Sequence, residues 1–306
     1  MARTLIRRVG YGLIAVLGVA ILAFILEFVV PGDPARAIAP RAGSAEVLRN
    51  IRIQLHLNQP LAVQFADYFL GLLHGNLGTS YVQRQPVATL IGQRLAATGW
   101  LALAGVAAEV VIGGALGLAA TVFRRVRIAV SAVNLVLLAV PQFVVGLVLL
   151  LVFGFQLHAA PVTGGAGAAQ IVLPALTLGL VGAPWYAQIV ADQMQDSLAS
   201  AYVRTAVAKG LTDRYILRRH VLRNVLSPAV TMVGLDLGAY LSGVVTVEVV
   251  FGWPGIGQLA VSSLQNLDRP VIMGTVIVGA VAVVAFNLLA DLVRMQVDPR
   301  TRQEAA

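Results

Sequence analysis

The sequence AYVRTAVAKGLTDRYILRRHVLRNVLSP, residues 201–228, is a basic and polar segment that lies between two long apolar runs. Lys209, the only lysine of the chain, lies within it. In a protein this apolar, such a segment is either a passive loop in the cytosol or a surface that a partner grips. A passive loop that only follows the positive-inside rule needs no internal order. Ordered structure within the segment would therefore favour a surface that a partner grips over a passive loop.

The basic segment has the pattern of two short helices. Residues 201–209 have helical apolar spacing, and Gly210 stands where a glycine commonly ends a helix. Thr212 can cap a second helix, and Leu211 and Ile216 are spaced for a hydrophobic staple across its start. The segment therefore predicts a helix, a glycine corner and a second helix, which favours a docking surface.

Composition sets the class of protein. Hydrophobic residues make up 58% of the 306 residues and charged residues only 12%, and the mean hydropathy is +0.83. These values indicate a polytopic membrane protein rather than a soluble domain. The net charge of +8 does not predict nucleic-acid binding, because the position of the charges matters more than their sum. There is no cysteine, so neither disulfides nor thiolate metal sites are expected.

The first apolar run covers residues 9–30 and follows three arginines. A secretory signal peptide is one interpretation, with Ala37-Ile38-Ala39 as a cleavage site. The run is longer than the apolar part of a signal peptide and matches the roughly 20 residues that cross a bilayer. We therefore expect residues 1–30 to form a short tail and an uncleaved first span.

Residues 31–97 are expected to form a helical insertion between the first two spans. The sequence Pro31-Gly32-Asp33-Pro34 ends the first span. Two helices are predicted next, over residues 44–55 and 60–73. An amphipathic stretch over residues 86–95 then predicts an elbow that lies in the membrane interface.

Five further runs are long enough to cross a membrane, which makes six transmembrane helices in an all-α integral membrane protein. One side would carry 15 basic residues in short loops, and the other side only Arg269. The positive-inside rule then predicts that both termini and the basic segment are cytosolic. The five predicted runs are residues 98–122, 128–153, 171–190, 228–250 and 271–293.

Several chemistries are excluded by missing motifs. A P-loop of the form GxxxxGK[ST] is absent, because Lys209 lies between Ala208 and Gly210. The four histidines have no metal-ligand spacing, and no GxSxG sequence exists for a nucleophile elbow. An intramembrane protease could pair Glu109 with Asp236, but nothing in their flanking sequence supports this. We expect no catalytic residue, metal or cofactor in this chain.

Acidic residues inside apolar spans are costly and therefore candidates for function. Glu109 lies near the middle of the second predicted span and Asp236 within the fifth. Either could line a transport path, where a carboxylate would suit the ammonium group of a peptide. Equally, either could bond to a neighbouring helix or satisfy a polar group of a neighbouring subunit. Glu248, like Glu27 and Asp291, lies closer to a span end, where water is expected to be within reach.

The sequence EVVFGWPGIG, residues 248–257, predicts irregular backbone at the outer membrane face. Phe251 and Trp253 are expected to anchor it at the interface. Non-helical backbone at that depth must be buried in protein or line water. We therefore expect Glu248, Phe251, Trp253 and Pro254 to belong to a gate or to a contact with an external partner.

Together these sequences resemble a known family. Residues 202–211, with Arg219-His220 and Pro228 after them, are similar to the cytosolic coupling loop of ABC importer permeases of the dipeptide, oligopeptide and nickel branch. The broad permease motif is Glu-Ala-Ala followed by a glycine four residues after the second alanine. This chain has Arg204, Thr205 and Ala206 at the first three positions and Gly210 in register, so the glutamate is missing. Further landmarks of the same family occur in the expected order along the chain: PGDP, GNLGTS, PQF, LPA, EVVFGWPGIG, DRP, NLLAD and DPR.

The resemblance implies that the helical insertion over residues 31–97 is extracytoplasmic. It implies a permease core over residues 98–293, a coupling loop over residues 191–227 and a cytosolic tail over residues 294–306. It also implies the partners: a second homologous permease, two ABC ATPase subunits that bind ATP and Mg, and an extracytoplasmic solute-binding protein, all at a lipid bilayer. The residues expected to dock an ATPase are Tyr202, Val203, Arg204, Thr205, Ala206, Lys209, Gly210 and Arg214.

Short peptides are the solute that we expect, and this permease branch also serves nickel complexes, haem and glutathione. A secondary transporter driven by an ion gradient is the alternative from a different class, and a membrane scaffold without transport is a third. The secondary transporter would be favoured if the purified chain alone moved solute without ATP.

Overall fold

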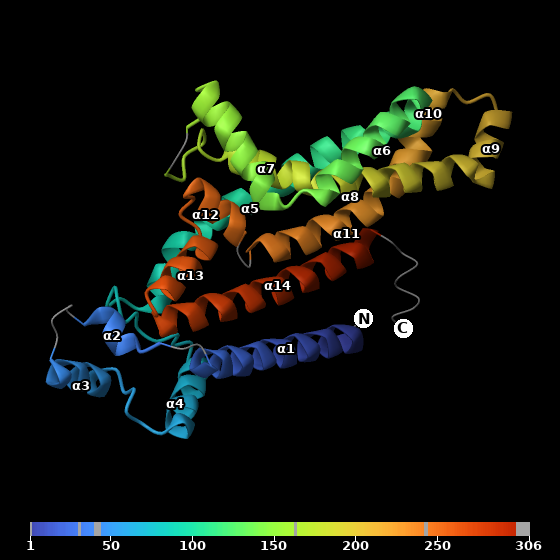
Figure 1. The fold of residues 1–306 in the computed structure, drawn as a ribbon. Coiled ribbons are helices and arrows are strands. Elements are labelled where there is room, and N and C mark those ends of the chain that lie inside the picture. Colours follow the sequence, from blue (N-terminus) through green and yellow to red (C-terminus); the bar gives the residue numbers. More distant parts are fainter. Residues whose placement is uncertain (1, 30–31, 40–43, 162–163, 242–243, 298–306) are drawn as a thin grey trace.

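The computed structural model describes residues 2–29, 32–39, 44–161, 164–241 and 244–297. In these ranges the chain is helical and has no strand, only an isolated bridge between Thr79 and Pro86. The all-α membrane fold is therefore confirmed (Figure 1). Its elements are α1 Ala2–Val29, α2 Pro34–Ile38, α3 Ala45–Gln54, α4 Leu61–Leu73, α5 Val87–Val122, α6 Arg124–Ala139, α7 Gln142–Leu149, the π-helical η1 Leu150–Gln156, α8 Val172–Ala199, α9 Ala201–Ala208, α10 Asp213–Ile216, the π-helical η2 Leu217–Val221, α11 Leu222–Leu241, α12 Val245–Phe251, α13 Ile256–Gln265 and α14 Arg269–Val297.

In the described part of the chain, four helices are long and apolar enough to cross a membrane, and two bent helix pairs bring the number to six if each pair is one span. The predicted span over residues 128–153 is bent by 104° between α6 and α7. Val140 is extended there, because the proline that follows it, Pro141, disfavours the helical conformation in the residue before it. The predicted span over residues 228–250 is bent by 59° between α11 and α12. Each of these two predicted spans therefore consists of two helices that meet at an angle.

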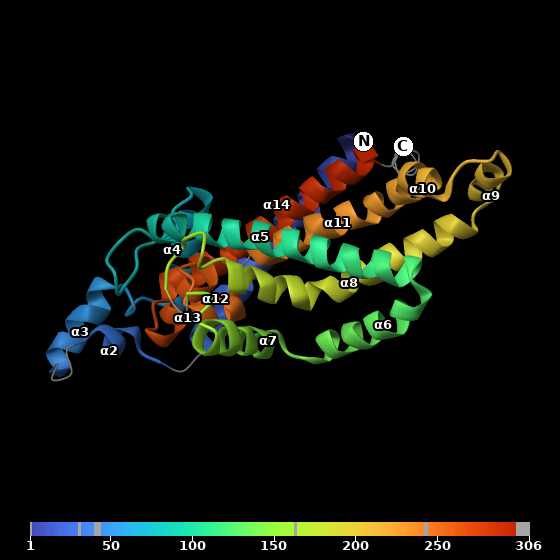
Figure 2. The same cartoon turned by 90° about the horizontal axis from the view of Figure 1, so that it is seen from above.

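Helices α5 and α8 form the spine of the molecule, packed side by side along most of their length (Figure 2). Small residues let their backbones approach closely. A Cβ at Gly113 would lie 2.5 Å from the carbonyl oxygen of Ala183, and one at Gly117 would lie 2.5 Å from that of Ala187. Helix α8 can therefore lie this close to α5 only because neither of these two positions carries a side chain.

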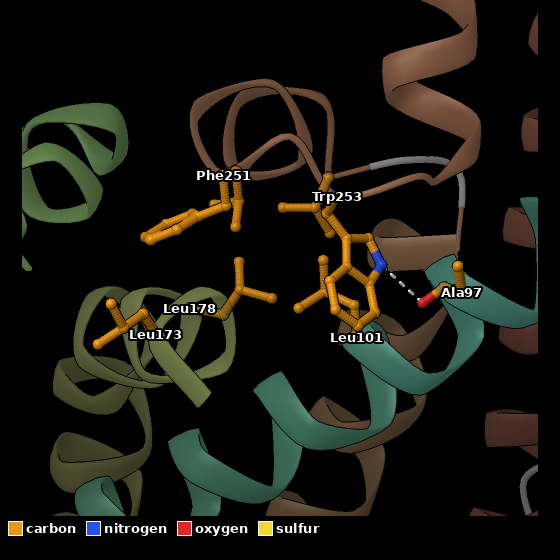
Figure 3. Packing of buried hydrophobic residues seen from close by; sticks show 8 residues of the cluster. Ala97, Leu101, Leu173, Leu178, Phe251 and Trp253 are labelled. Carbon is orange, nitrogen blue, oxygen red and sulfur yellow. Dashed lines mark hydrogen bonds between the residues drawn. The ribbon is translucent and has the colours of Figure 1, made fainter. Parts of the chain in front are cut away.

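A buried apolar cluster joins the spine to the loop between α12 and α13 (Figure 3). Trp253 is 2% exposed, and its Nε1 donates a hydrogen bond of 2.9 Å to the carbonyl oxygen of Ala97. Phe251 is buried in the same cluster with Leu178. The expectation that Phe251 and Trp253 anchor the chain at the membrane interface is wrong, because both rings fill the protein interior.

The predicted interfacial elbow is the first part of α5, which continues without a break to Val122. Its apolar residues Val87, Leu90 and Ile91 are buried and pack on a cluster from α13 and the start of α14. The apolar face of this stretch is therefore covered by protein, and it does not lie on the membrane surface. Leu95, which was expected on that face, is 43% exposed.

The insertion after α1 contains the two predicted helices, α3 and α4. Ser44 caps α3, accepting a hydrogen bond from the N–H of Val47. Phe24 of α1 packs its ring against Phe65 and Tyr68 of α4. Burial raises the pKa of Tyr68 to about 12, because removal from water disfavours the charged phenolate.

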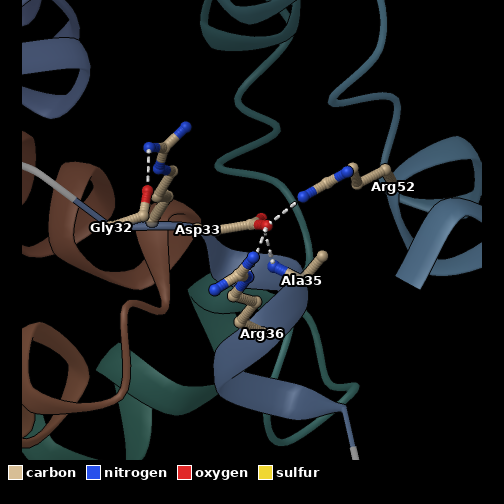
Figure 4. A network of polar contacts seen from close by, with 6 residues as sticks. Gly32, Asp33, Ala35, Arg36 and Arg52 are labelled. Atoms are coloured by element: carbon tan, nitrogen blue, oxygen red, sulfur yellow. Dashed lines mark hydrogen bonds and ion pairs between the residues drawn. The ribbon is translucent and has the colours of Figure 1, made fainter. Parts of the chain in front are cut away.

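Asp33 connects the start of α2 to α3 (Figure 4). Its Oδ1 accepts from the N–H of Ala35, and its Oδ2 lies 2.5 Å from a guanidinium nitrogen of Arg52 and 3.9 Å from one of Arg36. Burial alone would raise the pKa of the Asp33 carboxyl, but the hydrogen bonds from Arg52 and Ala35 and the two positive charges lower it. The ionised form is therefore the one that holds α2.

This network predicts a pH dependence at the start of α2. Because the folded pKa of Asp33 is lowered, its contribution is complete above the ordinary value of 3.8 and is lost as the pH falls through the lower folded value. Amide hydrogen exchange of Ala35 and Arg36, corrected for intrinsic rates, is expected to show loss of protection in that acidic window. The Arg52→Gln variant should lose protection at higher pH, and identical profiles for both proteins would contradict the account.

The two ends of the molecule differ in character. The start of α1, the end of α14 and the α9–α10 region lie toward one end, and α2, α3, α12 and α13 lie toward the other (Figures 1 and 2). The clusters of basic residues at the start of α1, at the start of α6 and in the basic segment share the first end. This arrangement agrees with the charge distribution expected from the positive-inside rule.

Candidate functional site

The corner of the basic segment, at Gly210, is a capped C-terminus of a helix. Helix α9 ends at Ala208, and Gly210 has a left-handed φ of +76°. The N–H of Gly210 donates to the carbonyl oxygen of Val207, and the N–H of Leu211 donates to that of Ala206. These two bonds are those of a Schellman motif. The glycine corner predicted from the sequence is therefore confirmed.

The two helices of the basic segment share a buried core with α8. Val203 and Ala206 of α9 pack with Val190 and Met194 of α8 and with Ile216, all less than 9% exposed. Leu211 is 37% exposed and lies outside this cluster, so the backbone bonds at the corner, rather than the predicted staple, are what the structure shows there. The segment is thus packed on the membrane core.

The helix after the corner continues further than expected. Pro228 was predicted to start the fifth span, but α10, η2 and α11 follow one another directly and Pro228 lies inside α11. The basic helix and the membrane helix are therefore one continuous element. No loop separates the basic end of this element from its membrane part.

The predicted docking residues divide into two groups. Tyr202, Arg204, Lys209, Gly210 and Arg214 are exposed. The exposed hydroxyl of Thr205 donates to the carbonyl oxygen of Ala201, and Val203 and Ala206 are buried. Val203 and Ala206 are therefore not available for direct contact with a partner. An open groove of about 350 Å³ beside the corner is lined by Thr212, Arg214, Tyr215, Arg218 and Arg219.

The two intramembrane acids of the sequence line one cavity of about 190 Å³ between α5, α8 and α11. Glu109 is 1% exposed and accepts a hydrogen bond from the hydroxyl of Tyr240. Asp236 accepts one of 2.6 Å from the hydroxyl of Tyr186. We call this space the carboxylate cavity; the lining residues used below are Glu109, Gly182, Trp185, Tyr186, Asp236 and Tyr240.

Sequence reasoning identified the acids of the carboxylate cavity but missed their tyrosine partners. Tyr240 lies four residues after Asp236, which places both on one face of α11. That spacing was a signal available in the sequence. Tyr186 had none, because its partner Asp236 lies 50 residues away.

Glu248 is a buried structural residue, and the expectation of water at this position is wrong. It is fully buried and accepts hydrogen bonds from the hydroxyl of Thr98, at 2.8 Å, and the N–H of Gln258, at 2.9 Å. A Cβ at Gly255 would overlap its carboxyl group, and one at Gly257 would lie 2.9 Å from its Oε2. These glycines of the sequence GWPGIG therefore leave room for the carboxylate. Side-chain burial of Glu27 and Asp291 lies outside the described structure.

Of the four predicted gate residues, only Pro254 is partly exposed. Glu248, Phe251 and Trp253 are buried around the α12–α13 loop, where Gly252 has a left-handed φ of +60°. Any part that these three take in gating must come from holding the loop. They do not line a path in the described structure.

Residues 109–303 match the family described as the binding-protein-dependent transport system inner membrane component, and residues 1–102 match its N-terminal family. The chain belongs to this family. It is a permease subunit of an ABC importer, embedded in the membrane, and works in general with ATPase and solute-binding partners. ATP hydrolysis is carried out by separate ATPase subunits, so the permease is not an enzyme.

Relatives of the permease are known at similar length. It is 38% identical over 291 residues to the glutathione transport system permease protein GsiC of Salmonella typhimurium strain LT2, covering 93% of this chain and 94% of the relative. The GsiC protein of Escherichia coli strain K12 is 36% identical over the same coverage. A solved structure of the MetNI methionine ABC transporter matches 68% of this chain and 96% of its own chain, with a TM-score of 0.58 and 19% identity. That likeness supports the fold alone.

Removing the Glu248 carboxylate is expected to destabilise the permease strongly. In Glu248→Ala the Thr98 hydroxyl and the Gln258 N–H lose their buried acceptor, at about 1–3 kcal/mol for each unsatisfied group. Thermal unfolding of the detergent-solubilised permease should therefore start at a clearly lower temperature. Glu46→Ala, which removes an exposed carboxylate on α3, serves as the control. Equal unfolding temperatures for the two variants would show that the Glu248 network contributes nothing.

Proposed function

We propose that the permease forms one half of the translocation path of an ATP-driven importer for short peptides. Glutathione, itself a tripeptide, is the first substrate to test, since relatives with 36–38% identity are named as glutathione permeases. The carboxylate cavity supports a peptide, because two acidic side chains inside the membrane core suit the ammonium group that a free peptide carries.

The observation that carries this proposal is the continuous packing from the basic segment to the carboxylate cavity. Helix α9 packs on α8 through the cluster that contains Met194, and the helix after the corner continues directly into α11. Helix α8 carries Tyr186 and α11 carries Asp236. A partner that displaces the basic segment would therefore move both sides of the carboxylate cavity, which is what alternating access requires.

The exposed part of the basic segment is the proposed docking surface for an ATPase subunit. Tyr202, Arg204, Lys209 and Arg214 offer one aromatic ring and three positive charges on an ordered corner. The groove beside them is lined by Arg214 and two further arginines. Arginine forks bind carboxylates in a bidentate manner, so the docking site on the ATPase is expected to be acidic.

The proposed orientation follows from the ends of the molecule. Both termini and the docking surface would be cytosolic, and α2, α3, α12 and α13 would face the solute-binding protein outside the membrane. A second homologous permease would complete the path, and two ATPase subunits would bind ATP and Mg. This chain would hold no cofactor of its own.

Two measurements test the proposal. Gentle solubilisation of the tagged permease followed by mass spectrometry should recover a second permease, ATPase subunits and a solute-binding protein. The recovered complex, placed in proteoliposomes with its solute-binding protein, should then take up labelled glutathione or trialanine only when ATP is supplied to the ATPase side. Uptake of neither peptide, together with ATP-driven uptake of a nickel complex or haem, would overturn the peptide assignment.

A further inference from the structure

The carboxylate cavity contains a buried oxygen atom that no described group satisfies. Glu109 is 1% exposed, and its Oε1 accepts from Tyr240, but its Oε2 is buried and has no hydrogen-bond partner among the described residues. A tyrosine hydroxyl has a single proton to donate, and Tyr186 donates its proton to Asp236. A buried acceptor without a donor is costly, so the cavity lacks a hydrogen-bond donor or a positive charge.

The backbone around Glu109 leaves space for its carboxyl group. The Cα of Gly182 on α8 faces the Glu109 side chain so closely that a Cβ there would overlap the carboxyl group. Neighbouring positions on α8 carry side chains such as Val181 and Ala183. The glycine therefore leaves room for the Glu109 carboxyl group against α8. An apolar side chain in place of this buried carboxyl group would cost less free energy.

An aromatic ring lies on the more open side of the carboxylate cavity. Trp185 lines the cavity and is 55% exposed, whereas Tyr186 beside it is 2% exposed. The face of an indole ring attracts a cation within about 6 Å of its centre. Two carboxylates and an exposed tryptophan around one space are the groups that an organic ammonium ion prefers, because its N–H groups bond to oxygen and its charge lies over a ring.

The size of the carboxylate cavity limits what it can hold. Its volume of about 190 Å³ is below the roughly 300–1,000 Å³ of sites that enclose a drug-sized ligand. A whole tripeptide does not fit inside it, but an amino group with the first carbon atoms attached to it does. The cavity therefore suits one charged end of a larger solute whose remainder lies in the path.

The geometry points to the carboxylate cavity as a binding site for the primary ammonium group of the transported solute, held between Glu109, Asp236 and Trp185. This inference rests on the proposed import of peptides and adds the chemical group that the permease itself recognises. The permease would thus select solutes with a free amino group independently of the solute-binding protein. A peptide whose amino group is acetylated would lack the charge that the cavity accepts.

Protection of Glu109 from a hydrophobic carbodiimide tests the site directly. The purified complex of permeases and ATPases, without the solute-binding protein, is treated with dicyclohexylcarbodiimide, and modification of the Glu109 peptide is followed by mass spectrometry. Saturating trialanine or methylammonium is expected to slow this modification about tenfold. N-acetyl-trialanine at the same concentration is expected to leave the rate unchanged.

Matched variants assign the effect to the cavity. Asp236→Asn removes one carboxylate with almost no change of volume and should abolish the protection of Glu109 by trialanine. Asp67→Asn removes an exposed carboxylate on α4 and should leave the protection intact. Equal protection by the acetylated peptide, or no protection by either amine in the wild-type complex, would overturn the ammonium site.

Uptake measured in parallel separates the two proposals. ATP-driven uptake of trialanine or glutathione without any protection of Glu109 overturns the ammonium site and leaves the importer for peptides standing. Protection by methylammonium without uptake of either peptide overturns the peptide substrate and supports the site. Glu109 that resists the carbodiimide with no amine present would also overturn the ammonium site, because the carboxyl group would then not be open to ligands from the path.

Discussion

Replacing Gly113 by alanine is expected to lower the thermal stability of the permease and to reduce its uptake of solute. A Cβ at this position would lie 2.5 Å from the carbonyl oxygen of Ala183 and 2.6 Å from the Cβ of Tyr186. The carbonyl belongs to the backbone of α8, so the helices must separate to admit a methyl group. Overpacking of this kind costs about 1–3 kcal/mol, and the separation would also displace Tyr186 from Asp236.

Gly114 provides the matched control for this prediction. A Cβ there would meet nothing within 4 Å, and alanine is favoured over glycine in a helix by about 1 kcal/mol. Thermal unfolding in detergent should therefore show Gly113→Ala below and Gly114→Ala at or above the wild-type midpoint. If both variants unfolded at the wild-type temperature, the close approach of α5 and α8 would be refuted.

Gly210→Val is expected to block ATP-driven uptake while the permease still inserts into the membrane. Gly210 has a φ of +76°, and a Cβ on it would meet nothing within 4 Å. Only the backbone conformation therefore opposes a side chain here. Valine tolerates this left-handed region poorly, at a cost of roughly 1–2 kcal/mol or more, so the corner that presents Lys209 and Arg214 should be distorted.

Gly210→Asn is the control that distinguishes two effects of the valine variant: strain of the backbone, and obstruction of the partner by a side chain. Asparagine adopts the left-handed conformation more readily than other side chains. It should therefore retain most of the uptake and most of the ATPase that co-purifies with the permease. Wild-type uptake by the valine variant would contradict a docking function of the corner, and equal loss in both variants would mean that a side chain at this position obstructs the partner.

The basic segment was predictable from the sequence because its structure is local. Helix α9 ends through a bond from the N–H of Gly210 to a carbonyl three positions earlier and one from the N–H of Leu211 to a carbonyl five positions earlier, and the cap at Ser44 also acts within one helical turn. Helix boundaries that depend on such short-range chemistry were largely correct. The bend at Pro141 was also visible in the sequence as a proline, but its angle depends on what α6 and α7 pack against.

Contacts between distant residues could not be predicted in this way. Trp253 was expected at the membrane interface because indole rings are common there, yet it bonds to Ala97, 156 positions away. Glu248 was expected near water, but its partner Thr98 is 150 positions away. An acid or an aromatic ring near a span end has the same local pattern whether it faces solvent or fills a core, and only tertiary packing decides between them.

The chain has no cysteine, so one introduced cysteine is the single thiol of this subunit and tests the docking surface at a defined position. A bifunctional thiol and amine cross-linker is applied to the assembled importer carrying Arg204→Cys on α9 or, as the control, Asp67→Cys on α4; both positions are exposed. We expect Arg204→Cys to cross-link to an ATPase subunit and Asp67→Cys not to do so. An ATPase cross-link at position 67 with none at position 204 would contradict both the orientation and the docking of the ATPase on the basic segment.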